Sequence, residues 1–235
     1  MDNSIKTDVL IVGAGPVGLF AVFELGLLNL KCHVIDILDK PGGQCAQLYP
    51  EKPIYDIPAY PMITGQDLTE NLLKQIKPFT PEFHYEHLAD NIEKLDDGSW
   101  LVETDKGLTF NVNAIVIAAG GGSFEPKKPN IPNLDHFDKS VRYSIDKIER
   151  FRNKDIVILG GGDSALDWTV QLFDVAKSLT LVHRRDSFRG APATVEKVMD
   201  LRDKGKIQFH VGQVNEIIGE NGCINSVTCV KKMRL

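Results

Sequence analysis

Several features are scarce in this 235-residue sequence, and each scarcity excludes a class of protein. Its four cysteines form no C-x-x-C pair and show no metal-ligand spacing, so we expect reduced thiols and no disulfide framework. Lys and Arg number 27 against 32 Asp and Glu, so the chain lacks the basic excess that nucleic-acid binding requires. Glycines and a proline interrupt the one long apolar run, residues 9–30. We therefore expect a cytoplasmic protein without a membrane span or export signal.

What the sequence does contain is one pattern that occurs twice. Each copy is a short apolar strand, a glycine-rich turn, a helix and a second strand. In the first copy the strand is expected at residues 8–12, the turn at 13–18, the helix from there to about 28, and the second strand at 32–37. In the second copy the strand is expected at 155–159, the turn at 160–165, the helix from there to about 176, and the second strand at 179–183. A glycine turn between a strand and a helix is the fingerprint of a dinucleotide-binding βαβ unit. Two copies in this context predict two nucleotide sites.

The turn residues are expected to have separate roles. The first glycine makes the tight turn, the second lets the backbone approach a pyrophosphate, and the third lets the helix pack against the strand. Each helix N-terminus then offers unpaired N–H groups to the diphosphate. The turn positions predicted to bind cofactor are Gly13, Gly15, Pro16 and Gly18 in the first copy, and Gly160, Gly162, Asp163, Ser164 and Ala165 in the second.

The end of each second strand predicts which nucleotide binds. Asp36 lies 23 positions after the first glycine of its turn, where a carboxylate accepts hydrogen bonds from a free ribose, as in FAD or NAD. At the same distance in the second copy stands His183, followed by Arg184 and Arg185, with Arg189 nearby. Guanidinium groups suit a ribose 2′-phosphate, which favours NADP(H). The alternative is a solvated basic turn.

The segments after each copy predict further sheet structure. Residues 91–95, 100–104 and 109–112, separated by Asp-Gly and Lys-Gly turns, predict an antiparallel meander that leads to a parallel strand at 114–119. The second copy is expected to begin the same meander at 207–211, 216–218 and 224–231, with no counterpart of 114–119. We therefore expect an α/β fold of two Rossmann-like, three-layer ββα domains, residues 1–122 and 123–235, each with a parallel sheet and an antiparallel meander. The second is expected to lack its last strand, unless it is naturally minimal.

Six motifs together resemble the ferredoxin–NADP⁺ reductases of the thioredoxin-reductase-like type. They are the turns 13–18 and 160–165, Pro-Gly-Gly-Gln at 41–44, Leu-Tyr-Pro-Glu-Lys at 48–52, Tyr-Asp-Ile-Pro at 55–58, and His-Arg-Arg-Asp-Ser-Phe-Arg at 183–189. Thioredoxin reductase is similar in both nucleotide motifs but carries a redox C-x-x-C before the second turn. Residues 142–147 stand there in this chain and contain no cysteine, so thioredoxin is a poor candidate substrate.

The resemblance implies FAD and NADP(H) as cofactors and a flavoprotein oxidoreductase activity. Hydride would pass between NADPH and flavin N5, and single electrons between flavin and ferredoxin or flavodoxin, in a homodimer. No catalytic acid–base residue is predicted. The positions carried over as FAD contacts, together with the glycine that precedes Gln44, are Val17, Asp36, Gly43, Gln44, Tyr49, Ala89 and Phe124. Taken without the family, Ala89 and Phe124 are packing residues. The chain is also expected to end before the carboxy-terminal part of such proteins.

Some alternatives stay open at this point. The acceptor is ferredoxin or flavodoxin, or else a quinone or small disulfide, or the chain is a non-catalytic nucleotide-binding module. A cluster of basic residues is either a docking surface for an acidic partner or a solvated linker: Lys127, Lys128, Arg142, Lys147, Arg150, Arg152 and Lys154. We expect no metal site at His84 and His87, which predict an exposed polar segment, and we expect Cys45 to be a small buried residue.

Overall fold

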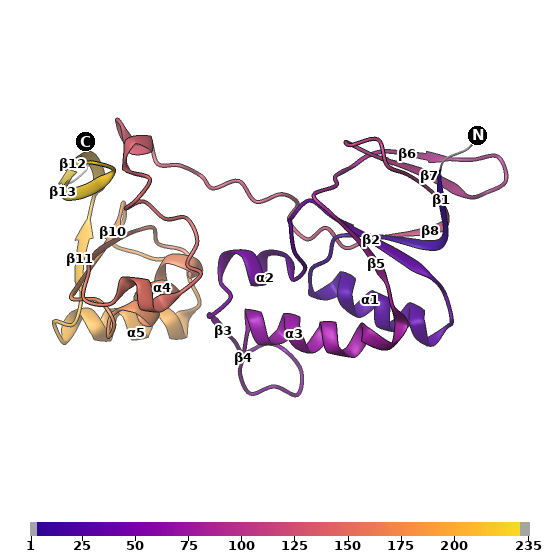
Figure 1. Cartoon of the computed structure of the whole chain (residues 1–235). Helices are drawn as coiled ribbons and strands as arrows, with labels where there is room; N and C mark the ends of the chain where they lie inside the picture. The colour runs from indigo at the N-terminus through magenta and orange to yellow at the C-terminus, as the bar shows by residue number, and fades with distance from the viewer. Residues whose placement is uncertain (1–3, 231–235) are drawn as a thin grey trace. The chain divides into compact units, whose positions relative to one another are not determined.

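The computed structural model describes residues 4–230, which form two compact units (Figure 1). The first comprises the described residues up to Pro126 together with Ser144–Asp146, and the second comprises Lys127–Tyr143 and the described residues from Lys147 onward. Each unit contains one of the two glycine turns. The functional boundary between residues 122 and 123 stays a prediction, and the predicted end of the last strand, Lys231, lies outside the described residues.

The first unit is built on a six-stranded sheet. Its strands, in spatial order, are β5 (Glu82–Tyr85), β2 (Cys32–Asp36), β1 (Ile5–Val12), β8 (Thr109–Ile117), β7 (Trp100–Thr104) and β6 (Ala89–Lys94). Strands β5, β2, β1 and β8 are parallel, and β7 and β6 add to them antiparallel. The predicted combination of a parallel sheet with an antiparallel meander is therefore confirmed.

Strand β8 differs from the sequence prediction of two separate strands at 109–112 and 114–119. It is continuous: its first half pairs antiparallel with β7, and the strand pairs parallel with β1 from Phe110 to Ile117. Its register joins Ile5 to Phe110 at one end and Val12 to Ile117 at the other. The meander and the parallel sheet therefore share this strand, because Asn113 continues the extended backbone instead of turning it.

Both faces of the parallel strands are covered. Helices α1 (Pro16–Leu27) and α3 (Gly65–Ile76) pack on one face, around Val9, Ile11 and Val34 (Figure 1). The opposite face buries Leu10 and Ile35 against residues of β7 and β8. Burial on both faces explains why β1 and β2 read as near-continuous apolar runs instead of alternating ones.

A shorter substructure follows β2 in the same unit. It consists of helix α2 (Gly43–Leu48), the hairpin of β3 (Pro53–Ile54) and β4 (Ile63–Thr64), and, after α3, a 3-10 helix at Lys77–Phe79. Thr64 is the N-cap of α3, where its hydroxyl accepts a hydrogen bond from the Asp67 N–H at 3.1 Å. Neither α2 nor α3 was predicted from the sequence.

The second unit contains a three-stranded parallel sheet in the order β11 (Gln208–Val211), β10 (Ser178–His183) and β9 (Asp155–Leu159). Helices α4 (Asp163–Leu172) and α5 (Pro192–Asp203) contact each other and bury Leu166 and Val198. The remaining elements are 3-10 helices at Leu134–Phe137 and Ile148–Phe151 and the antiparallel hairpin of β12 (Gln213–Glu220) and β13 (Cys223–Val230).

Two sequence predictions for this unit need correction. The strand expected at 207–211 is not the start of a meander, because β11 pairs parallel with β10. The helix expected to reach about residue 176 ends at Leu172, since the chain turns there and the Val175 carbonyl accepts the Asn153 N–H at 3.0 Å. Among residues 4–230, none of the helices combines the length and apolarity needed to cross a bilayer.

Candidate nucleotide-binding sites

Two positions of the first turn have no room for a side chain. A Cβ atom at Gly13, whose φ is +108°, would lie 2.4 Å from the Ala118 carbonyl oxygen. A Cβ at Gly18 would lie 1.9 Å from the Gly13 carbonyl oxygen. Glycine at these positions therefore lets β1, β8 and α1 approach one another at the carboxyl end of the sheet.

The middle glycine of this turn has room for a Cβ atom instead. Gly15 is the N-cap of α1, and the nearest atom to a Cβ built there is the Gly43 Cα at 3.9 Å. Gly43 itself has a φ of +57°, and the neighbouring Gly42 N–H donates to the Ala14 carbonyl at 2.9 Å. The two glycine loops thus form a backbone cradle, and the first turn of α1 carries no acidic residue that would repel an anion there.

Asp36, the last residue of β2, holds the glycine turn in place. Its Oδ2 accepts a hydrogen bond from the Ala14 N–H at 2.6 Å, and its Oδ1 accepts one from the Leu38 N–H at 2.8 Å. The residue is 9% exposed, so these bonds are largely shielded from water. Each carboxylate oxygen retains acceptor capacity for a ribose hydroxyl. This structural role of Asp36 was not anticipated from the sequence.

Helix α2 places Gln44 and Tyr49 beside the cradle. Gln44 follows Gly43 in the first turn of α2, and Tyr49 is its C-cap. The Cys45 Sγ lies 3.7 Å from the Tyr49 hydroxyl. Burial, followed by the neighbouring Cys45 and Asp56, raises the pKa of Tyr49 to about 12, so the phenol stays neutral and keeps its O–H donor. Cys45 is half-buried, not buried as predicted.

The other three predicted FAD contacts lie in different surroundings. Val17, in the first turn of α1, is 71% exposed, and Phe124 is 46% exposed. Ala89 begins β6 and packs against the core cluster that contains Leu10 and Ile35. The described contacts therefore give Ala89 a packing role, while the two exposed side chains are available to a ligand.

The second turn opens onto a pocket of about 210 Å³. The residues that line it are Gly161, Gly162, His183, Arg184, Arg185, Ser187 and Arg189. A Cβ at Gly161 would lie 2.5 Å from the His183 ring, so glycine is needed where imidazole and turn meet. Five of these seven residues were predicted as nucleotide contacts. Gly161 and Ser187 were missed, although both lie inside the motifs that were recognised.

Backbone hydrogen bonds fix the loop that carries Arg189. The Arg189 N–H donates to the Gly161 carbonyl at 2.8 Å, and the Ala191 N–H donates to Asp163 Oδ1 at 2.8 Å. Asp163 thus ties the loop to the start of α4 and does not line the pocket. Ser164 is exposed on the first turn of α4, outside the lining. A Cβ at Gly160 would lie 2.8 Å from the Ala165 Cβ, which favours small residues at both positions.

The pocket is strongly basic. Burial, followed by Arg184, Arg185 and Arg189, lowers the pKa of His183, so its imidazole is neutral near pH 7. The three guanidinium groups are exposed and positively charged. The arrangement suits a dianionic group such as a phosphate monoester.

The prediction that His84 and His87 form an exposed polar segment is wrong. His84 lies on β5 and is half-buried, with its ring packed against Phe110 at a centroid distance of 5.2 Å. His87 is also half-buried, and its Nδ1 lies 3.1 Å from the Thr104 Oγ1. The sheet pairing of β5 with β2 buries this segment, a pairing that the sequence analysis did not predict.

The predicted basic cluster is partly neutralised by its own neighbours. Lys128 forms an ion pair with Asp135 at 2.6 Å, and Arg152 pairs with Glu149. Arg142 donates to the Val141 carbonyl at 2.9 Å. Both the docking surface and the solvated linker stay predictions for these residues.

Comparison with known proteins agrees with the two nucleotide motifs. The chain matches the family described as pyridine nucleotide-disulphide oxidoreductase over residues 7–234. Ferredoxin–NADP reductases of Parvibaculum lavamentivorans and Mesorhizobium japonicum are 57% and 58% identical to it over 96% and 97% of the chain. It spans 66% and 67% of their own length, or about two thirds.

A solved structure shares the same fold. The thioredoxin reductase of Lactococcus lactis is 27% identical, with a TM-score of 0.79 over 96% of this chain and 71% of that one. Both the α/β fold class and the resemblance stated from the sequence motifs are thereby confirmed. This chain belongs to the pyridine nucleotide-disulphide oxidoreductase family, and the curated relatives that it resembles are ferredoxin–NADP reductases.

Proposed function

We propose that this chain is an FAD-dependent oxidoreductase that passes electrons between NADPH and ferredoxin or flavodoxin. The observation that carries the proposal is the contrast between two similar turns. One is followed by a buried carboxylate, Asp36, and the other by a pocket with three arginines. A carboxylate favours a nucleotide with free ribose hydroxyls, and the arginines favour one with a 2′-phosphate.

The first unit fits FAD. Its cradle at Gly15 and Gly43 brings the N-terminus of α1 to the position proposed for a diphosphate. Asp36 receives the adenosine ribose, and Gln44 and Tyr49 supply amide and phenol hydrogen bonds near the flavin. When bound, FAD supplies the conversion between two-electron hydride transfer and one-electron transfer.

The second unit fits NADPH. Gly162 and the N-terminus of α4 receive the pyrophosphate, while Arg184, Arg185 and Arg189 hold the 2′-phosphate by charge-assisted hydrogen bonds. His183 adds a neutral aromatic face, since its ring stacks on Phe188 at 5.7 Å. These residues bind and orient the nucleotide, and we assign none of them a proton-transfer step.

The acceptor is proposed from the names of the curated relatives and from the cysteines. A disulfide relay needs two cysteines at redox spacing, and the four in this sequence form no C-x-x-C pair. Ferredoxin and flavodoxin are usually acidic, so docking is expected to involve a basic surface and to weaken as salt rises. A homodimer remains a prediction from the family.

The test is the NADPH-dependent reduction of ferredoxin by the chain supplied with FAD, followed through the ferredoxin absorbance at low and high salt. A benzoquinone and a small aromatic disulfide serve as alternative acceptors. We expect ferredoxin to be reduced, with a rate that falls as salt rises. Turnover with only the quinone or the disulfide would overturn the proposal that ferredoxin is the acceptor. The absence of turnover with every acceptor would overturn the proposal that the chain is an enzyme.

A further inference from the structure

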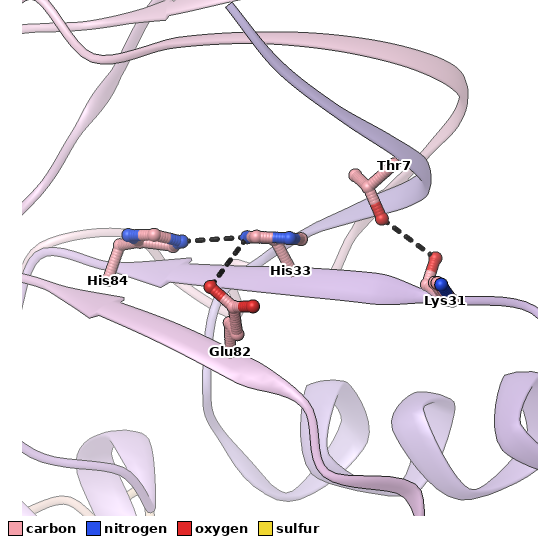
Figure 2. Close-up of polar contacts among 5 residues, drawn as sticks. All are labelled: Thr7, Lys31, His33, Glu82 and His84. Atoms are coloured by element: carbon pink, nitrogen blue, oxygen red, sulfur yellow. Dashed lines mark hydrogen bonds and ion pairs between the residues drawn. The ribbon is translucent and has the colours of Figure 1, made fainter.

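A second group of chemically capable residues lies on β2 and β5, within the first unit. His33 of β2 is directly opposite Glu82 of β5 in the parallel register, and His84 lies two residues after Glu82. Because side chains alternate along a strand, Glu82 and His84 lie on the same face of the sheet. Figure 2 shows the three side chains pointing toward one another from the two neighbouring strands.

The potential ligand atoms of these three side chains lie close together. The His33 Nδ1 lies 2.8 Å from the His84 Nε2 and 3.9 Å from the Glu82 Oε2. The three potential ligand atoms all lie within 4.8 Å of one another. The two imidazole planes are inclined by only 10°, and the two facing nitrogens share a hydrogen bond. An ion bound between them requires the donor ring to carry its proton on its other nitrogen.

We propose that His33, Glu82 and His84 form a binding site for a divalent transition-metal ion, with Zn²⁺ as its best fit. Two imidazoles and one carboxylate are a ligand set that Zn²⁺ uses when it keeps an open fourth position. At Zn–N distances near 2.0 Å, tetrahedral ligands are about 3.3 Å apart. The two imidazole nitrogens therefore need to separate by about 0.5 Å.

The surroundings prepare the two histidines for coordination. The His33 side chain is 13% exposed, and both rings meet Phe110 edge-on at centroid distances of 5.8 Å and 5.2 Å.

Access to the site is open on the carboxylate side. The Glu82 side chain is 72% exposed, so an ion can enter from solvent and keep a water as its fourth ligand. A bound ion would fasten the edge strand β5 to β2, close to Asp36, whose carbonyl accepts the His87 N–H at 2.9 Å. We therefore expect Zn²⁺ to stabilise the first unit, independently of any flavin.

The experiment is a Zn²⁺ titration against a chromophoric chelator, with thermal unfolding measured in Zn²⁺ and in EDTA. The parent and all variants carry C223S and C229S, since those exposed thiols also bind zinc. We expect one equivalent of Zn²⁺ and a higher Tm in the parent. E82Q should weaken binding by at least about tenfold, and H33Q and H84Q should abolish it.

Matched controls separate coordination from structure. E86Q removes an exposed acid from the turn directly after β5, and H210Q removes an exposed histidine from the second unit. Both should keep the parental stoichiometry and affinity. E82Q should keep the parental Tm in EDTA, because its side chain is mostly exposed. Zinc binding that is unchanged in E82Q and H84Q, or absent from the parent at micromolar Zn²⁺, would overturn the proposal.

Discussion

At the scale of single residues, Asp36 combines a structural and a proposed binding role. Replacing it by alanine leaves the N–H groups of Ala14 and Leu38 without their acceptors, and an unsatisfied buried donor costs about 1–3 kcal/mol. We expect D36A to lower the free energy of unfolding by about 2–4 kcal/mol in urea denaturation. D36N retains one acceptor oxygen and should lose about half as much. Equal stability of D36A and the parent would contradict this role.

The arginines of the second pocket are expected to select the nucleotide. Charge-assisted hydrogen bonds contribute about 1.5–3 kcal/mol each, so R184Q/R185Q, which removes two of them, should raise the Kd for NADPH by about hundredfold or more. The Kd for NADH should change little, because NADH lacks the 2′-phosphate. R202Q is the matched control, since Arg202 pairs with Asp203 on α5, outside the pocket. Isothermal titration measures these affinities, and a parallel loss of NADH affinity would contradict the assignment.

At the scale of elements, two glycines of the first turn have different roles: Gly18 allows close packing, and Gly15 lies where the ligand is proposed to bind. A Cβ at Gly18 would collide with the Gly13 carbonyl, so we expect G18A to destabilise the protein by about 1–3 kcal/mol. A Cβ at Gly15 meets no atom closer than 3.9 Å, so G15A should change stability by less than about 1 kcal/mol.

In FAD affinity we expect the larger effect from G15A, the variant with the smaller effect on stability. G15A places a methyl group in the cradle proposed for the pyrophosphate, so its FAD affinity should fall by at least about tenfold. Denaturant unfolding and FAD titration on both variants provide the measurements. A folded G15A protein that binds FAD as tightly as the parent would contradict the cradle.

The strands of the βαβ units were predictable because local signals agree there. The 155–159 strand was predicted with its observed bounds, since an apolar run ends in glycines on one side and charged residues on the other. The continuity of β8 was not predictable, because pairing with β7 and β1 at once is decided by distant residues. Helix α2 has only six residues and begins at two glycines with positive φ, so its sequence has no hydrophobic periodicity that predicts a helix.

At the scale of the whole molecule, the sequence repeat predicted two nucleotide units, and the structure contains two units with one turn each. The arginine pocket was predicted nearly complete because its residues lie in two short motifs of one βαβ unit, the turn at 160–165 and the stretch 183–189, at the spacing of the first unit. The site of His33, Glu82 and His84 was not predicted, because His33 and His84 lie 51 positions apart and only the β2–β5 pairing joins them. Long-range pairing thus limited what the sequence alone could predict.

The central claim is that one unit holds FAD and the other delivers NADPH to it. The most direct measurement is the visible absorption spectrum of the purified chain, supplied with FAD, before and after anaerobic addition of NADPH or NADH. We predict a bound-flavin spectrum that NADPH bleaches at concentrations at least about tenfold below those needed with NADH. A chain that retains no flavin, or a flavin that NADH bleaches as readily as NADPH, would contradict the account.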